Sequence, residues 1–352
     1  MKSIMIFVST EYHLLLAVNL MMKLYNNAEK YNIELYIRGG RKSKRLNRPY
    51  DFSHLPVKVL YFDEIVSSEK DLAESAKNAV IELMDKKPDI FIFFQEQDVL
   101  MVILSDHFHR NGSEVILCQD GLKPYAQLQF HSLGLFLSNH RQNLWLKKNG
   151  FKVENWLSPI TSKHYGFLRG ISKLYLTSPD LYRNWNGREL SKIEMLPIPE
   201  LDEILSRLFA WDDALLPACE NVIFYMNQPM KGTNNTEIKL LDELGKRFPH
   251  NRMIIKAHPL TSESTYQQYE NLANVSVIRS TIPAELFIIK LKNSLILSIN
   301  STSMLLNVPA NKYYYLYMLF RDELKRLSRM KIDRYPAEHV IAIHAVSEIS
   351  FY

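Results

Sequence analysis

Short apolar runs alternate with stretches of helical periodicity through the first part of the chain. Apolar runs of about four to eight residues are typical of buried strands, and apolar residues three or four positions apart are typical of helices. The strands expected on this basis are 3–10, 33–38, 57–62, 90–94 and 114–119, and the helices are 12–25, 72–84 and 99–109. This alternation predicts a parallel sheet covered by helices on both faces.

The same rhythm returns after residue 220. The expected strands are 221–226, 252–257, 275–278, 294–299 and, as the last one, 313–318; the expected helices are 237–247, 264–272, 283–291 and one that begins at Ser301. Residues 125–210 are less regular, with a helix near 135–148 and a strand at 173–177, and three prolines mark 195–220 as the linker. The pattern therefore predicts an α/β protein of two doubly wound, Rossmann-like domains, 1–200 and 201–352, that face a cleft.

Composition agrees with a globular protein of two domains. The chain has 352 residues, of which 47% are hydrophobic and 23% charged. Its two cysteines, Cys118 and Cys219, have no metal-binding spacing, and we expect thiols in a reducing compartment, the cytoplasm. The apolar run 3–8 is too short for a signal peptide, and no stretch reaches the roughly 18 uncharged apolar residues of a membrane span.

The net charge of +5 is concentrated in two basic segments. Each holds six basic residues: Arg38, Arg41, Lys42, Lys44, Arg45 and Arg48 in the first, and Arg321, Lys325, Arg326, Arg329, Lys331 and Arg334 in the second. Such clusters either attract anionic lipids and acidic glycans or are solvated surfaces. No recognition motif accompanies them, so nucleic acid is not an expected partner.

We expect Asp120 and Gly121 to form a tight turn directly after the expected strand 114–119. A carboxylate held by such a turn at a cleft can act as a general base toward a sugar hydroxyl. The alternative is that Asp-Gly only makes the turn. Weaker candidates on the acceptor side are Gly121 itself and Thr10, which lies in the turn after the first expected strand.

Two later strand ends carry groups suited to a phosphate. His258 and Pro259 follow the run 252–257, and a histidine there can donate a hydrogen bond to a departing phosphate, although many strand-end histidines are structural. A second strand is followed by four polar residues at an expected helix N-terminus: Asn300, Ser301, Thr302 and Ser303. Hydroxyls and free amides at a helix start favour phosphate binding, although helix capping explains one of them. Gln228 opens the second half and is a further donor-binding candidate.

Other cofactor and nucleotide motifs are absent from the sequence. It contains no Asp-x-Asp for a metal-bound sugar nucleotide, no Walker loop, no Gly-x-Gly-x-x-Gly and no Gly-x-Ser-x-Gly. We therefore expect neither a metal nor another cofactor.

The turn at Asp120-Gly121, the His258-Pro259 pair and the later Ser301-Thr302 turn together resemble motifs of bacterial sialyltransferases. The similarity is to glycosyltransferase family 52, the lipooligosaccharide sialyltransferases, and to the bacterial polysialyltransferases. The opening Ser-Thr-Glu-Tyr-His-Leu-Leu at 9–15 and the Asn-Gln-Pro-Met turn at 227–230 are also similar to family 52.

The resemblance implies a GT-B glycosyltransferase. It implies inverting, metal-independent transfer of sialic acid from CMP-sialic acid to a hydroxyl of a bacterial surface glycan, a lipooligosaccharide or capsule. By position, Asp120 would be the general base, His258 would assist departure of the CMP phosphate, and Ser301, Thr302 and Ser303 would bind it. The sequence departs from the motif at Gln119, where the family has an acidic residue. We expect this difference to affect the preference for acceptor or donor and not the base, Asp120.

Several alternatives stay open. The sugar could be Kdo or another nonulosonate, the chain could be an epimerase or a CDP-dependent polyol-phosphate transferase, or it could bind nucleotide or glycan without catalysis. The acceptor, the linkage, the number of sugars added and the oligomeric state, a homodimer included, are not predicted. With a lipid-linked acceptor, the basic segment 38–48 is a candidate contact to the inner leaflet of the cell membrane.

Overall fold

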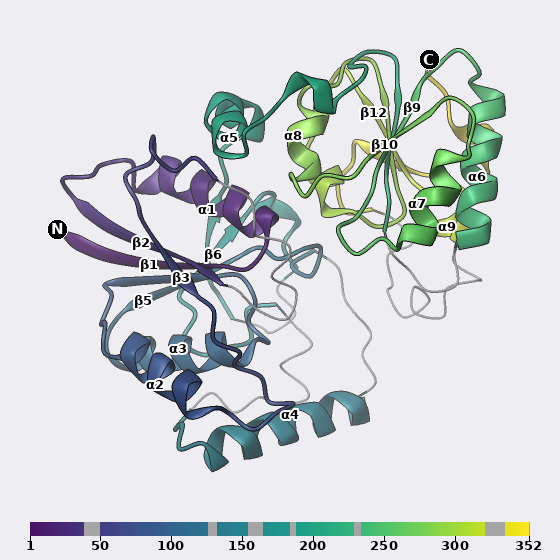
Figure 1. Ribbon diagram of the computed structural model, residues 1–352. Coiled ribbons are helices and arrows are strands. Elements are labelled where there is room, and N and C mark those ends of the chain that lie inside the picture. The colour runs from purple at the N-terminus through teal and green to yellow at the C-terminus, as the bar shows by residue number, and fades with distance from the viewer. Residues whose placement is uncertain are drawn as a thin grey trace. The chain divides into compact units, whose positions relative to one another are not determined.

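The computed structural model describes residues 1–38, 50–125, 132–153, 165–183, 188–228, 234–320 and 335–351. The chain forms two compact units: unit 1 is Met1–Pro197 and unit 2 is Ile198–Tyr352. Both are layered α/β structures (Figure 1).

Unit 1 is built on a seven-stranded sheet in the order β3-β2-β1-β4-β5-β6-β7, in which every neighbouring pair is parallel. The strands are β1 (Lys2–Val8), β2 (Tyr31–Arg38), β3 (Lys58–Phe62), β4 (Ile90–Phe93), β5 (Glu114–Cys118), β6 (Lys173–Leu176) and β7 (Ser191–Glu194). The helices are α1 (Glu11–Leu24), α2 (Glu74–Met84), α3 (Val99–Arg110) and α4 (Ser132–Lys148). In Figure 1, α1 covers one face of the sheet, and α2, α3 and α4 lie on the other.

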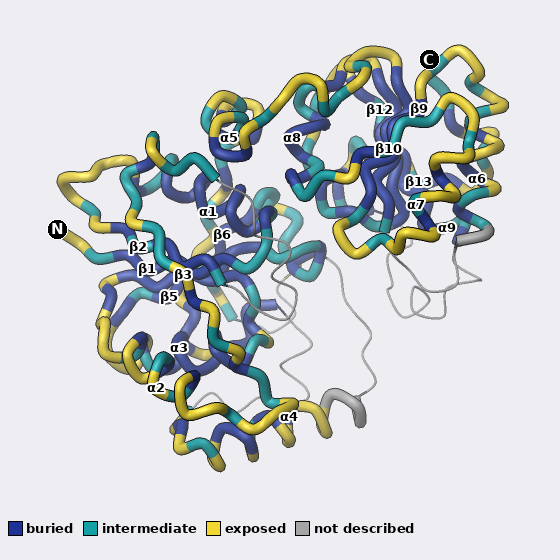
Figure 2. The backbone as a smooth tube through the Cα atoms, viewed as in Figure 1, coloured by how far each residue is buried: buried dark blue, intermediate teal, exposed yellow. Residues whose placement is uncertain are grey.

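Local sequence explains where these elements begin and why they are buried. The central strands are continuous apolar runs because helices cover both faces, and Figure 2 shows them buried. The Thr10 side chain caps α1 by accepting from the His13 amide, and Asp98 caps α3 in the same way.

Unit 2 repeats the design with a six-stranded parallel sheet in the order β10-β9-β8-β11-β12-β13. Its strands are β8 (Ile223–Met226), β9 (Met253–Lys256), β10 (Val275–Ile278), β11 (Leu295–Ser298), β12 (Lys312–Tyr315) and β13 (Val340–Ala342). Its helices are α5 (Asp202–Leu208), α6 (Asn234–Arg247), α7 (Glu263–Glu270), α8 (Ala284–Ile288) and α9 (Tyr317–Phe320). The α8 helix lies on one face of the sheet, and α6 and α7 lie on the other (Figure 1).

Both sheets follow the doubly wound strand order, which confirms the predicted fold class. The order reverses between β1 and β4 in unit 1 and between β8 and β11 in unit 2. In open α/β sheets, ligands bind outside the carboxyl ends of the strands at this switch point. The turns that follow β1, β4, β8 and β11 are therefore where a site is expected.

Three expectations about elements were wrong. The strand expected at 313–318 ends at Tyr315 and is followed by the short helix α9, and β13 rather than β12 ends the sheet. The helix expected from Ser301 is a four-residue 3₁₀ turn, η6 (Thr302–Leu305). The backbone is already extended at Leu306, with a φ of −71° and a ψ of 119°, and Pro309 also disfavours helical geometry at Val308.

The supposed linker also contains the helix α5, which packs against α8. Apart from Arg38, the two basic segments lie outside the described residues. Among the helices of the described part, none is long and apolar enough to span a membrane.

Candidate active site

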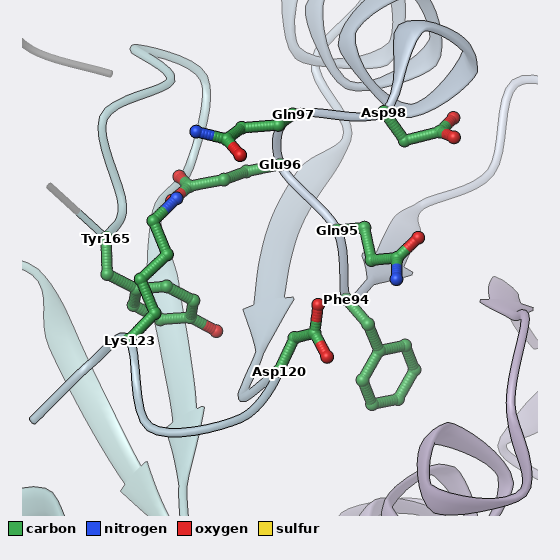
Figure 3. A pocket seen from close by; sticks show the side chains of 8 residues that line it. All are labelled: Phe94, Gln95, Glu96, Gln97, Asp98, Asp120, Lys123 and Tyr165. Carbon is green, nitrogen blue, oxygen red and sulfur yellow. The ribbon is translucent and has the colours of Figure 1, made fainter. Parts of the chain in front are cut away.

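Asp120 lies two residues after the end of β5, next to the turn after β4 at the switch point of unit 1. Gly121 follows it with a φ of +71°, a conformation that glycine adopts without strain. The Asp120 side chain is 40% exposed and lines a pocket of about 310 Å³. The other lining residues come mainly from the turn after β4 (Figure 3): Phe94, Gln95, Glu96, Gln97, Asp98, Lys123 and Tyr165.

His13 of α1 holds the Asp120 carboxylate from the side of β1. Its Nε2 lies 3.2 Å from Asp120 Oδ1, and the ring is only 1% exposed. The Nδ1 atom accepts the Ser9 amide at 3.3 Å, so the ring proton of the neutral histidine belongs on Nε2, from which it donates to Asp120. The ring also stacks on Phe94 at 4.5 Å, which fixes its plane.

The protonation of Asp120 suits a base. Burial by itself raises the pKa of this carboxyl, but hydrogen bonds from His13 and Gln95 and the nearby charge of Lys123 outweigh it and hold the pKa below its usual value. Asp120 is therefore ionised at neutral pH and can accept a proton.

A buried ion pair borders the same pocket. Lys123 Nζ lies 2.8 Å from Glu96 Oε1, and Glu96 Oε2 accepts the amides of Gly166 and Phe167 at 2.9 and 3.1 Å. In Figure 3 the ends of the Lys123 and Glu96 side chains meet. Burial raises the pKa of Glu96, while Lys123 and the two amides oppose that rise. The pair connects the turns after β4 and β5 to the segment that carries Tyr165, so it fixes the pocket wall.

Gln119, the departure from the family motif, does not face the pocket. It is fully buried, and its Oε1 accepts from the Thr177 amide at 3.0 Å, the Thr177 hydroxyl at 2.8 Å and the Tyr125 hydroxyl. Its Nε2 donates to the Tyr12 hydroxyl at 2.9 Å. A side chain held in this way cannot reach a substrate, so its role is to hold the turn that presents Asp120.

Replacing Gln119 by alanine is expected to destabilise unit 1 by about 2–4 kcal/mol, because it leaves several buried polar groups without partners. Urea unfolding followed by circular dichroism measures the change. Gln97, which lines the pocket but is more exposed, is the matched position for a control alanine variant, with an expected change of at most about 0.5 kcal/mol. Equal effects at the two positions would contradict the structural role of Gln119.

Two other predicted residues of unit 1 have structural partners. The Thr10 hydroxyl accepts the His13 amide at 3.2 Å and so places the histidine one turn into α1. Arg38, the first residue of the basic segment, forms an ion pair with Asp98 and is only 13% exposed. It therefore supports Asp98, a residue that lines the pocket, and is not a solvated surface charge.

His258 lies at the carboxyl end of β9 in unit 2 and is partly buried. Its Nδ1 accepts the Leu260 amide at 3.1 Å, so the neutral ring carries its proton on Nε2 and presents a donor there. Pro259, which follows, is exposed. The Asn227 side chain accepts the His258 amide at 3.4 Å and the Thr261 hydroxyl at 2.6 Å, and this fixes the loop.

Asn227 itself is part of a buried network. Its Nδ2 donates to Glu237 at 2.9 Å and to the Tyr269 hydroxyl at 2.7 Å, and Tyr225 donates to the same carboxylate at 2.6 Å. Burial raises the pKa of Glu237, against the effect of these hydrogen bonds. The network ties the ends of β8 and β9 to α6 and α7, and Gln228 follows it, partly buried.

The polar turn after β11 lies at the same sheet edge as His258. Ser301 caps η6 by accepting the Ser303 amide at 3.3 Å, and the Ser303 side chain bonds to buried Glu285. The backbone amide of Asn300 donates to the Ser298 hydroxyl at 3.3 Å. Two of the three hydroxyls thus have structural roles, and Thr302 is the most exposed of them. A helix dipole cannot be invoked for a single 3₁₀ turn.

The structure therefore assembles two separate groups of residues, one in each unit. Asp120 lies with His13, Glu96 and Lys123, none of which we predicted as site residues. The sequence did offer one signal: His13 is a polar residue directly before the apolar run 14–18, near the start of the expected helix. Within the described ranges, no three His, Cys, Asp or Glu residues are grouped as a metal site would need.

Comparison with known proteins shows the family. Residues 4–315 match the model of the alpha-2,8-polysialyltransferase (POLYST) family, whereas no curated protein matches the chain. That match confirms the resemblance to bacterial polysialyltransferases.

Among solved structures, a 2,6-sialyltransferase from Photobacterium sp. (Vibrionaceae), in complex with CMP and lactose, superposes with a TM-score of 0.54 at 11% identity over 97% of this chain and 78% of that one. The GT-B domain of a sialyltransferase from Photobacterium damselae gives 0.52 at 10% identity over 92% and 98%. A putative UDP-N-acetylglucosamine 2-epimerase from Listeria monocytogenes gives 0.51 at 8% identity over 85% and 74%. The chain thus has the GT-B fold, belongs to the alpha-2,8-polysialyltransferase family and is a glycosyltransferase of the sialyltransferase type.

Proposed function

We propose that the protein transfers sialic acid from CMP-sialic acid to a hydroxyl of a bacterial surface glycan, a lipooligosaccharide or capsule, with inversion at the anomeric carbon. The observation that carries the proposal is the Asp120–His13 pair, an ionised carboxylate held in a pocket at the switch point of unit 1. Family membership supports the sugar class, and the CMP and lactose bound to the Photobacterium sp. enzyme support a nucleotide donor and a glycan acceptor.

In this mechanism Asp120 is the general base. The acceptor hydroxyl attacks the anomeric carbon as its proton passes to Asp120, the bond from that carbon to the CMP phosphate breaks, and CMP leaves with the electron pair. Attack opposite the leaving group inverts the configuration. His13 acts as a positioning residue, because its Nε2–H keeps the carboxylate oriented and ionised.

We assign the donor to the strand ends of unit 2. His258 Nε2–H would donate to the CMP phosphate as charge develops on it, and the 300–303 turn would contribute Thr302 and amides. Gln228 and Pro259 remain donor-binding candidates. A single departing phosphate held in this way needs no metal, and we expect the transfer rate to be unchanged by EDTA.

Mass spectrometry of products tests the proposal. The protein is incubated with CMP-sialic acid or CMP-Kdo and a small panel of neutral and sialylated acceptors. A sialylated product is expected; a Kdo product would replace the proposed donor, and the absence of any product, together with a thermal shift by CMP, would favour a nucleotide-binding protein without catalysis. UMP serves as the control nucleotide and is expected to give no shift.

Replacing His13 by phenylalanine is expected to slow transfer by about 10- to 100-fold, because the stacking on Phe94 is kept but Asp120 loses its orienting donor. Losing that hydrogen bond raises the pKa of Asp120, so the acidic limb of the rate profile moves to higher pH. Glutamine, which can still donate, should restore part of the rate. A His13→Phe profile that coincides with the wild-type profile would show that the histidine has no influence on the base.

A further inference from the structure

The outward face of α4 exposes large apolar side chains. Leu144, Phe136 and Leu137 are 54%, 49% and 46% exposed, and they are three of the nine large apolar residues that are exposed in the described part of the chain. All three lie on one helix, which runs along the outside of unit 1, beyond α2 and α3 (Figures 1 and 2). Such a concentration on one element marks an interaction surface.

The opposite face of α4 already has its partners. Trp145 and Leu146 are buried in the core of unit 1 with Val80 and Leu83 of α2. The Trp145 indole donates to the Lys70 carbonyl at 2.6 Å and fixes the rotation of the helix. The exposed leucines therefore cannot turn inward, and the protein's own core does not explain them.

Basic residues border the apolar ridge on both sides. Residues seven apart lie on one line of a helix, so Leu137 and Leu144 form the ridge. Two parallel lines flank it, one of Arg141 and Lys148 and the other of His140 and Lys147, all of them exposed. Lys148 pairs with Asp71 at 2.6 Å, and α4 contains no acidic residue.

We propose that this face of α4 docks on the surface of a membrane that contains anionic lipid. The leucine ridge would enter the interface between head groups and acyl chains, while Arg141 and Lys147 extend their charges to lipid phosphates. A second copy of the chain fits less well, because two identical basic faces would repel each other. An acidic glycan fits the charges but leaves the aliphatic ridge exposed to water.

This inference is independent of the donor and chemistry proposed above, since it concerns only how the enzyme reaches a lipid-bearing surface. The two can fail separately, because vesicle binding is measured without nucleotide or acceptor.

Co-sedimentation with vesicles of phosphatidylcholine, with and without phosphatidylglycerol, tests the proposal. The wild-type protein is expected to bind only the anionic vesicles appreciably. Replacing both Leu137 and Leu144 by serine is expected to weaken binding at least tenfold. The charge reversal Arg141→Glu with Lys147→Glu is expected to weaken it at least tenfold as well and to remove the preference for phosphatidylglycerol.

Matched variants control for hydrophobicity and net charge. Ile81→Ser removes a side chain that is 42% exposed on α2, and Lys239→Glu with Lys292→Glu makes the same change of net charge on exposed positions of unit 2. Both controls are expected to bind as the wild type, and circular dichroism checks the fold of every variant. Equal binding to neutral and anionic vesicles, or α4 variants that bind normally, would overturn the proposal. So would α4 variants whose only change is in oligomeric state, measured by analytical ultracentrifugation.

Discussion

Replacing Asp120 by asparagine is expected to lower the rate of sialyl transfer by about 10²- to 10⁴-fold while leaving the affinity for CMP unchanged. Asparagine keeps the size of the side chain and can still meet His13, but it cannot accept the proton of the attacking hydroxyl. Because the site that we assign to CMP lies on unit 2, loss of the base should not weaken nucleotide binding. Initial rates with CMP-sialic acid, together with titration calorimetry with CMP, measure the two effects.

The pH profile of the wild-type enzyme is a second test of the same residue. The pKa of Asp120 lies below its usual value, so the base stays ionised as the pH falls, and its loss of charge limits the rate only at a pH more acidic than the ordinary aspartate pKa. The exposed Asp63 provides the control, since Asp63→Asn should leave both rate and profile unchanged. Normal transfer by the Asp120 variant would refute its role as base, and loss of CMP binding would indicate that the substitution disturbs more than the chemistry.

The fold was largely predictable because the central strands are short, buried apolar runs. β4 and β8 are buried along their whole length, and in a parallel sheet covered on both faces such strands leave a clear pattern in the sequence. The edge strand β7 left no such pattern, because three of its four residues are exposed. Tyr317–Phe320 continues the apolar run of β12 as a helix, and composition alone does not separate the two.

The candidate site was only partly predictable, because a strand-end motif identifies a turn and not its contacts. Asp120 could be found from its turn, but His13 is 107 positions away in the sequence, and the pairing of β1 with β4 and of β4 with β5 brings the two together. The three hydroxyls of 301–303 appeared equivalent in sequence. In the structure, Ser301 and Ser303 are buried and hydrogen-bonded within the protein, and this leaves Thr302 as the stronger candidate.

Replacing His258 by alanine is expected to reduce both nucleotide affinity and transfer. The charge-assisted hydrogen bond that we assign to its Nε2–H and the CMP phosphate corresponds to about a 10- to 100-fold loss in affinity for CMP. Because that phosphate gains charge as CMP departs, the rate should fall further, by about 10²- to 10³-fold. Titration calorimetry and initial rates, at saturating and limiting CMP-sialic acid, separate the two effects.

Cytidine distinguishes a contact to the phosphate from a structural role. If His258 contacts the phosphate, the alanine variant binds cytidine with the same affinity as the wild type. It loses only the additional affinity for CMP that the phosphate provides. If the histidine merely anchors the loop through the Leu260 amide, cytidine and CMP binding weaken together, and Asn227→Ala, which releases the same loop, reproduces the effect. His250, which is exposed on the same unit, supplies the control variant, and His250→Ala is expected to change neither affinity nor rate. Normal CMP binding and normal sialyl transfer by the His258 variant would contradict this role. Another group of unit 2 would then have to donate to the departing phosphate.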